Sequence, residues 1–121
     1  MLPPAHRLKK EKEIKRALGG RMRAGNNLLV CRAAPNDLGV ARFCFAVSKK
    51  VSNKAAVRNL LKRRLRAAAA AMLAQIKPGF DCVLIARSGL EDKTYQEICG
   101  CLYGVLARSN LLTGSKTQNK K

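Results

Sequence analysis

Residues 42–66 read RFCFAVSKKVSNKAAVRNLLKRRLR, and this stretch decides the expected fold class of the 121-residue chain. Its first part, residues 42–48, alternates large and small side chains with a period of two, as a strand with one buried face does. The large set is Phe43, Phe45 and Val47. The small set is Cys44, Ala46 and Ser48. We therefore expect a strand whose large face lies in the core.

A long helix is expected after this strand, with Ser52 or Asn53 as its cap and its end near Ile76. At about 100° per residue, two sets of side chains separate on the helix surface, one within an arc of about 80° and one within about 140°. The apolar set is Val57, Leu61, Leu65, Ala68 and Met72. The polar set is Arg58, Asn59, Lys62, Arg63 and Arg66. The helix is thus predicted to carry a buried stripe and a basic stripe.

Residues 80–86 form an apolar run that predicts a second, buried strand. A strand, a helix and a strand in succession indicate two parallel strands of one sheet joined by a crossover, right-handed by default. The flanking elements are a basic helix over residues 8–18, a strand over 28–31, a turn at 35–37 and a last helix starting at Asp92 or Thr94. We expect one domain, residues 1–112, and a flexible basic tail, residues 113–121.

The charge of the chain indicates a polyanionic partner. Its 25 Lys and Arg residues outnumber its 7 acids, for a net charge of +18, and the 43 residues between Asp37 and Asp81 hold ten basic residues and no acid. Like charges one helical turn apart repel each other, so such a run weakens the fold unless an external anion neutralises it. Nucleic acid is favoured over an anionic membrane.

A membrane partner is not expected, because the longest apolar run, residues 67–74, is far shorter than the roughly 20 residues of a span. The first six residues also lack the pattern of a secretory signal, so the chain is expected to be cytoplasmic.

No catalytic or metal site is predicted. The single histidine is His6, and the seven acids are scattered, most of them at turns or exposed helical positions. The five cysteines show no paired metal-ligand spacing and are expected to be structural.

Two segments together carry a family resemblance: FCFAVSKKV at residues 43–51 and AVRNLLKRRLR at residues 56–66. RLKK at residues 7–10 and FDCVLIAR at residues 80–87 support it. Over about residues 7–107 the chain resembles the protein subunit of bacterial ribonuclease P. The combination of both basic halves is specific, whereas each half alone is weak.

This resemblance implies an α+β fold, a small sandwich with a central, mostly antiparallel sheet that is shared with a ribosomal-protein domain. It also implies an unusual left-handed β-α-β crossover that carries the basic helix, against the default hand. In that family the RNA subunit, with Mg²⁺, cleaves the 5′ leader from precursor tRNA. The expected partners are therefore ribonuclease P RNA and precursor tRNA, and no obligate protein partner is evident.

The resemblance also implies two groups of site residues. The expected contacts to the catalytic RNA are Lys49, Lys50, Lys54, Arg58, Asn59, Lys62, Arg63 and Arg66. The expected 5′-leader cleft, between the first helix and the sheet, holds Ile14, Lys15, Leu18, Val30 and Arg32. Ile14 and Leu18 stand where the family has aromatic residues, so weaker stacking on leader bases is predicted, with Lys15 or Arg32 as possible compensation. Leu60 stands where the motif usually has Arg, but it lies off the basic stripe.

Two other functions share the charge. A structural RNA-binding protein of ribosomal type is the main alternative, and the Ser-Lys-Lys and Arg-Asn-x-x-Lys-Arg pattern between two strands favours the ribonuclease P subunit over it. A DNA-binding regulator would need a compact helix-turn-helix pair, and residues 42–86 indicate strand, helix and strand instead.

Overall fold

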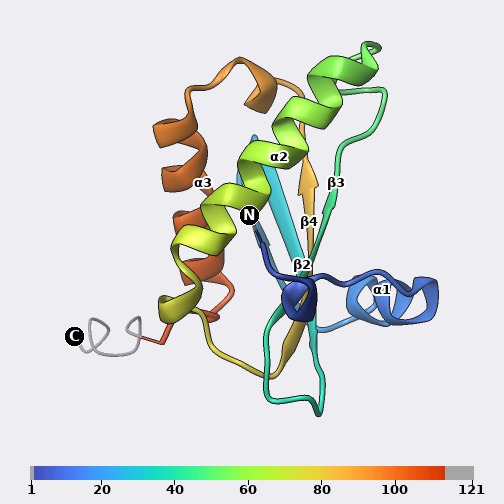
Figure 1. Ribbon diagram of the computed structural model, residues 1–121, viewed down its shortest axis with the longest axis vertical. Helices are drawn as coiled ribbons and strands as arrows, with labels where there is room; N and C mark the ends of the chain where they lie inside the picture. Colours follow the sequence, from blue (N-terminus) through green and yellow to red (C-terminus); the bar gives the residue numbers. More distant parts are fainter. Residues whose placement is uncertain (1, 114–121) are drawn as a thin grey trace.

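A four-stranded sheet with helices on both faces forms the core of the computed structural model, which describes residues 2–113 (Figure 1). The predicted tail, residues 113–121, lies outside this part except for Thr113. In chain order the elements are η1 (Pro4–His6), α1 (Glu11–Leu18), β1 (Met22–Gly25), β2 (Leu29–Pro35), β3 (Arg42–Ala46), α2 (Ala55–Ala71), η2 (Leu73–Gln75), β4 (Phe80–Ala86), η3 (Leu90–Asp92) and α3 (Tyr95–Arg108).

The strand order is β1-β2-β4-β3, with β1 and β4 antiparallel to β2 and with β3 parallel to β4. The mostly antiparallel sheet and the parallel pair around α2 are as predicted. Strand β1 was not predicted from the sequence. It is a four-residue edge strand in which Met22 and Ala24 are half-buried while Arg23 and Gly25 are exposed, so its pattern is too short to stand out.

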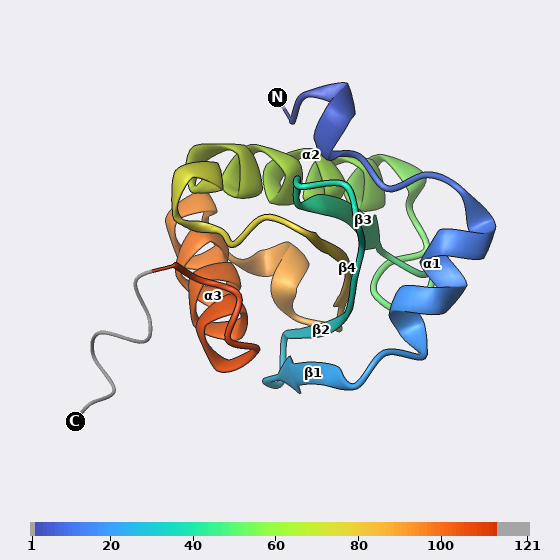
Figure 2. The ribbon, with the colours of Figure 1, turned by 90° about the horizontal axis from the view of Figure 1, so that it is seen from below.

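The crossover from β3 through α2 to β4 is left-handed. Seen from the face that α2 and α3 cover, with both strands pointing up, β4 lies to the left of β3 (Figures 1 and 2). The resemblance implied this hand, and the right-handed default is wrong here. With the same strand order, a right-handed crossover would place α2 on the opposite face, where α1 packs. In the observed arrangement Phe43 and Phe45 belong to the apolar layer that also holds Leu61 and Leu65 of α2.

Two apolar layers hold the sheet between the helices. The larger layer lies between the sheet and α2 and α3, and its fully or nearly fully buried side chains include Phe43, Leu61, Leu65, Leu84, Ile98 and Leu102. Each such side chain contributes about 1.5–3 kcal/mol relative to exposure. The smaller layer lies under α1 and consists of Leu8, Ala17 and Val83 with half-buried neighbours. No helix within residues 2–113 is long and apolar enough to cross a membrane.

The ends of the two outer helices have clear local causes. Thr94 caps α3 in a capping box: its hydroxyl accepts the Glu97 N–H at 3.1 Å, and the Glu97 carboxylate accepts the Thr94 N–H at 2.9 Å. The chain leaves α1 through Gly20, where a Cβ would lie 2.0 Å from the Ala33 carbonyl oxygen. Only glycine permits this close approach of α1 to β2.

Candidate nucleic-acid interface

Helix α2 begins later than the sequence indicated. Its cap residue is Lys54, and no side chain caps it, so the prediction of Ser52 or Asn53 as the cap is wrong. Ser52 instead stabilises the loop before the helix, where its hydroxyl accepts the Lys54 N–H at 3.2 Å. The Arg58 guanidinium donates to the Ser52 carbonyl at 2.9 Å and is thereby fixed over the first turn.

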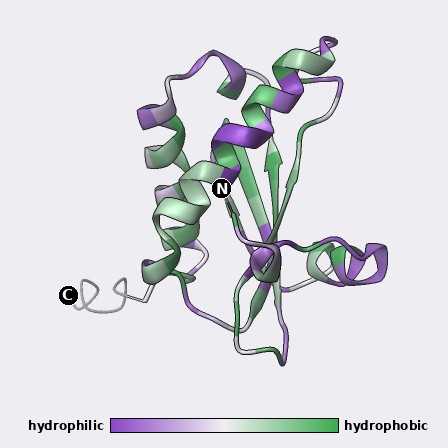
Figure 3. Cartoon of the chain, in the orientation of Figure 1, coloured by the Kyte–Doolittle hydropathy of each residue, from purple (hydrophilic) through white to green (hydrophobic). Residues whose placement is uncertain are grey.

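The two predicted stripes of α2 are present. Leu61, Leu65 and Ala68 are buried, Met72 is buried at the helix end, and Val57 is only half-buried. The polar side chains form two rows on the outer surface. A half-buried row at a spacing of four consists of Arg58, Lys62 and Arg66, and an exposed pair consists of Asn59 and Arg63. Figure 3 shows the alternation of hydrophilic and hydrophobic residues along α2.

Among the described residues, 2–113, the basic stripe has no acidic partner. In residues 2–113 every ion pair involves Glu11, Glu13 or Asp81, and none involves α2. Leu60 is 38% exposed and Arg64 is half-buried, so neither belongs to the buried stripe. An unneutralised row of this kind is suited to phosphate, which arginine binds through a two-pronged fork and lysine as a point charge.

The loop between β3 and α2 places three lysines at the N-terminal end of the stripe. Lys49, Lys50 and Lys54 are all exposed. The Ser88 hydroxyl donates to the Lys50 carbonyl at 2.9 Å, which ties this loop to the segment after β4. The lysines therefore extend the basic surface of α2 toward the carboxyl ends of the two parallel strands.

A second surface lies on the sheet face that α1 only partly covers. A hollow of about 480 Å³ has an apolar floor that includes Val30 and Ile85, and its rim includes Lys50 and Arg87. A neighbouring hollow of about 470 Å³ shares Val30 and Arg87 and reaches Arg23 of β1. Together they form an open track with apolar and cationic walls.

The predicted cleft residues are only partly brought together. Val30 lines both hollows. Ile14 and Leu18 pack beneath α1 against the smaller apolar layer. The Arg32 Nε is buried and has no hydrogen-bond partner among residues 2–113.

Lys15 lines none of these hollows. Its side chain is 73% exposed, and its ammonium pairs with Glu11 at 3.6 Å on the outside of α1. Exposed pairs of this kind contribute little to stability.

Sequence reasoning did not assign Arg87 and Ser88 to a site. The available signal was their position directly after β4, since the carboxyl ends of parallel strands meet at the same edge of the sheet, as Lys49 and Lys50 do after β3.

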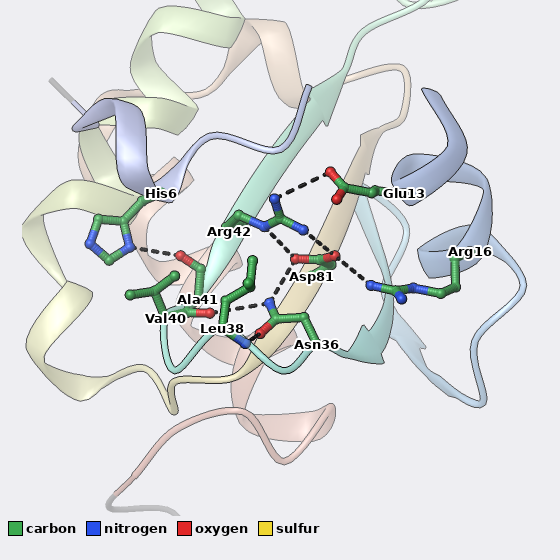
Figure 4. Close-up of polar contacts among 9 residues, drawn as sticks. All are labelled: His6, Glu13, Arg16, Asn36, Leu38, Val40, Ala41, Arg42 and Asp81. Atoms are coloured by element: carbon green, nitrogen blue, oxygen red, sulfur yellow. Dashed lines mark hydrogen bonds and ion pairs between the residues drawn. The ribbon is translucent and has the colours of Figure 1, made fainter. Parts of the chain in front are cut away.

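A buried ion-pair network fixes α1 to the sheet, and the sequence interpretation missed it (Figure 4). Asp81 is fully buried, which contradicts its treatment as one more scattered acid. The Arg42 guanidinium donates to both Asp81 oxygens at 2.8 Å, Asn36 donates at 2.8 Å and Arg16 donates at 3.2 Å. Arg42 also pairs with Glu13 of α1 at 3.2 Å. The network thus joins α1, β3, β4 and the turn after β2.

The protonation state of Asp81 follows from these contacts. Burial alone raises the pKa of the Asp81 carboxyl, but the hydrogen bonds from Arg42 and Asn36 and the positive charge of Arg42 outweigh it and leave the pKa below its ordinary value. Asp81 is therefore an ionised structural anchor, and its oxygens are engaged by the protein itself.

Fold and surface together define a class: a small basic α+β protein with an unneutralised helix stripe and an open sheet face, both suited to a polyanion. Comparison with known proteins narrows this class. Residues 2–110 match the Ribonuclease P family, so the chain belongs to the ribonuclease P protein family.

Relatives and solved structures agree. The chain is 34% identical to the ribonuclease P protein component of Microcystis aeruginosa, over 93% of this chain and 98% of the relative. It is 36% identical to that of Brevibacillus brevis, over 97% and 93%. The solved RNase P protein of Staphylococcus aureus is similar, with a TM-score of 0.80, 27% identity and coverage of 89% of this chain and 98% of that one. The α+β fold and the family that the resemblance indicated are confirmed.

Proposed function

We propose that this chain is the RNA-binding subunit of a ribonuclease P whose RNA carries out the cleavage, and that it works in the cytoplasm on precursor tRNA. The single observation that carries the proposal is the basic stripe of α2, which has no acidic partner in residues 2–113 and lies on a fold shared with ribonuclease P proteins.

The stripe is proposed to bind the backbone of ribonuclease P RNA. Arg58, Arg63 and Arg66 supply forks for phosphate, and Asn59 offers an amide to a sugar or a base edge. Its extension comprises Lys49, Lys50 and Lys54. Contacts of this kind position the protein on the RNA and make the affinity depend on salt.

The open face of the sheet is proposed to take the 5′ leader of precursor tRNA. A single RNA strand fits a track that offers an apolar floor to the bases and cations to the phosphates. Val30 and Ile85 supply the floor, and Lys50 and Arg87 supply the cations. Ile14 and Leu18 offer apolar contact without ring stacking. We therefore expect leader binding to depend more on charge here than in a subunit with aromatic residues.

The chain itself does not fit a magnesium ion. Within residues 2–113 no three His, Cys, Asp or Glu side chains gather to hold a metal, and the oxygens of the buried Asp81 already accept hydrogen bonds from Arg42, Asn36 and Arg16. The Mg²⁺ of the reaction is therefore proposed to be held mainly by the RNA subunit. The part of this chain is to bind and position the two RNAs.

The test is cleavage of precursor tRNA at low magnesium by a bacterial ribonuclease P RNA, alone and with this protein. A basic polypeptide of equal charge is the control. A large gain in rate at the correct 5′ site, absent with the control, is expected. An equal gain in rate with the control would mean that positive charge alone causes the stimulation. Tight RNA binding without any gain would favour the structural, ribosomal-type role.

A further inference from the structure

A third hollow, distinct from the two of the open track, lies at the free edge of β3, between the N-terminal segment and α2. Its volume is about 300 Å³, and three cationic side chains line it: Arg7, Lys9 and Arg66. No acidic residue lines it. We call this hollow the edge notch; of its three cations, the predicted site residues included Arg66 but not Arg7 or Lys9.

The cations of the edge notch are available to a ligand. The Arg7 Nε donates to the Leu2 carbonyl at 2.8 Å, which fixes the guanidinium. Its two terminal nitrogens remain available to bind an anion. Neither Lys9 nor Arg66 makes a side-chain hydrogen bond or ion pair with another residue in the described part of the chain. Arg42 and Arg16, by contrast, are neutralised by Asp81. The positive charge of the notch therefore calls for an external anion.

The main chain of β3 adds a donor. On one side β3 pairs with β4. On the other, among residues 2–113, it makes only the bridge between Arg7 and Phe43, where the Leu8 N–H donates to the Phe43 carbonyl at 2.8 Å. Because alternate residues of a strand turn their main-chain groups to the same edge, Phe45 presents its N–H on this free edge. Phe45 lines the notch, so a backbone donor joins the three cations.

The position of the notch between the two proposed RNA-binding surfaces indicates the kind of ligand that it binds. Helices α2 and α1 lie on different sides of the free edge of β3 (Figure 2). The open track lies on the α1 face of the sheet, since Ile85 belongs both to its floor and to the apolar layer under α1. The free edge of β3 is thus the rim between the α2 stripe and this face. The charges of Lys62 and Arg66 reach across this rim. Burial raises the pKa of the Cys44 thiol, which lies on the α1 face, and the positive charges of Lys62 and Arg66 act against that rise.

We propose that the edge notch binds one phosphodiester group of an RNA strand that crosses the rim from the α2 stripe to the α1 face. Arg7, Lys9 and Arg66 would share this phosphate, with the Phe45 N–H as an additional donor. The assignment rests on the proposed function for the identity of the RNA, which is either ribonuclease P RNA or the precursor tRNA leader. The phosphate itself is the chemistry common to both.

The first test needs no catalytic activity. Inorganic phosphate, and then a short single-stranded oligoribonucleotide, is added to the full-length protein while the amide signals of Leu8 and Phe45 are followed by NMR. We expect saturable shifts of these two amides that Arg66→Ala weakens severalfold and Arg108→Ala leaves unchanged. Arg108 is an exposed arginine on α3 and outside every surface described above, so it matches the lost charge. Shifts that are equal in both variants, or absent, would overturn the proposal even if the chain stimulates cleavage.

The second test identifies the RNA. Lys9→Ala, Arg66→Ala and the double variant are compared for affinity to ribonuclease P RNA alone, and, as holoenzyme, to precursor tRNAs with a one-nucleotide and a long leader. Because both side chains hold one phosphate, each single variant is expected to lose about fivefold to tenfold in RNA affinity. The loss of affinity in the double variant should be clearly smaller than the product of the two single losses. Coupled losses with ribonuclease P RNA assign the phosphate to that RNA. Coupled losses only with the long leader assign it to the leader. Losses that multiply independently, in variants with unchanged thermal stability, would contradict a shared phosphate.

Discussion

Replacement of Asp81 by asparagine is expected to lower the free energy of unfolding by about 3 kcal/mol, since removal of one partner from a buried ion pair costs roughly 3–5 kcal/mol. Asp81 is fully buried and accepts two 2.8 Å hydrogen bonds from Arg42, whose side chain is only 14% exposed. The lower end of the range applies for two reasons. Arg42 keeps Glu13 at 3.2 Å, and Arg16, whose side chain is 55% exposed, can return to water.

This loss is a large part of the roughly 6–18 kcal/mol expected for a domain of this size. Urea unfolding followed by circular dichroism measures it, with Asp92→Asn as the matched control because Asp92 is an exposed acid with no ion pair among residues 2–113. The control should unfold within about 0.5 kcal/mol of the natural protein. If the free energy of unfolding of Asp81→Asn also lies within that range, the cost of desolvating the ion-pair network cancels the attraction between its charges.

The same variant has a pH signature. The folded pKa of Asp81 lies below its ordinary value, so the stabilisation is complete above about pH 4, the unfolded pKa, and is lost as the pH falls through the lower folded pKa. The natural protein should therefore lose its advantage over Asp81→Asn only in acid. A constant difference down to pH 2 would refute the assignment of the stability to the ionised carboxylate.

The network also has a functional consequence because it fixes α1, which packs on the same sheet face as the proposed leader track. Asp81→Asn is expected to weaken binding of precursor tRNA with a long leader more than binding of ribonuclease P RNA alone. Equal losses in both would mean that the network supports the fold without positioning α1.

Four further predictions concern the interface and the packing of α1 and α3. Arg58→Ala should weaken binding to ribonuclease P RNA and reduce the slope of log affinity against log salt by about 1; an unchanged slope removes this side chain from the interface. Leu18→Phe should tighten binding of long-leader precursor tRNA by about 1 kcal/mol or more through base stacking and leave a one-nucleotide leader unaffected. Gly20→Ala should destabilise the fold by about 1–3 kcal/mol because its Cβ would lie 2.0 Å from the Ala33 carbonyl oxygen. Gly100→Ala, whose Cβ would meet nothing within 4 Å, should stabilise α3 by about 0.5–1 kcal/mol, and both changes are read from thermal melts.

Local patterns in the sequence were sufficient for the elements with a strong period. The alternation of Phe43 and Phe45 predicted β3, the apolar run at residues 80–86 predicted β4, and Thr94 was one of two expected caps of α3. These features depend on side chains two to four residues apart. The basic stripe of α2 belongs with them, since helical geometry alone places Arg58, Lys62 and Arg66 in one row.

Tertiary structure decided what depends on residues distant in the sequence. Asp81 and Arg42 lie 39 residues apart and meet only because β3 and β4 are parallel neighbours, so no local pattern marks Asp81 as buried. The edge notch likewise needs Lys9 and Arg66 to meet across the free edge of β3. The hand of the crossover also belongs to this level, because it depends on the edge of β3 at which β4 pairs, and no local pattern in the sequence marks that edge. The sequence by itself thus determined the charge, the stripes and the family resemblance, while packing determined which charges are neutralised within the fold and which remain for RNA.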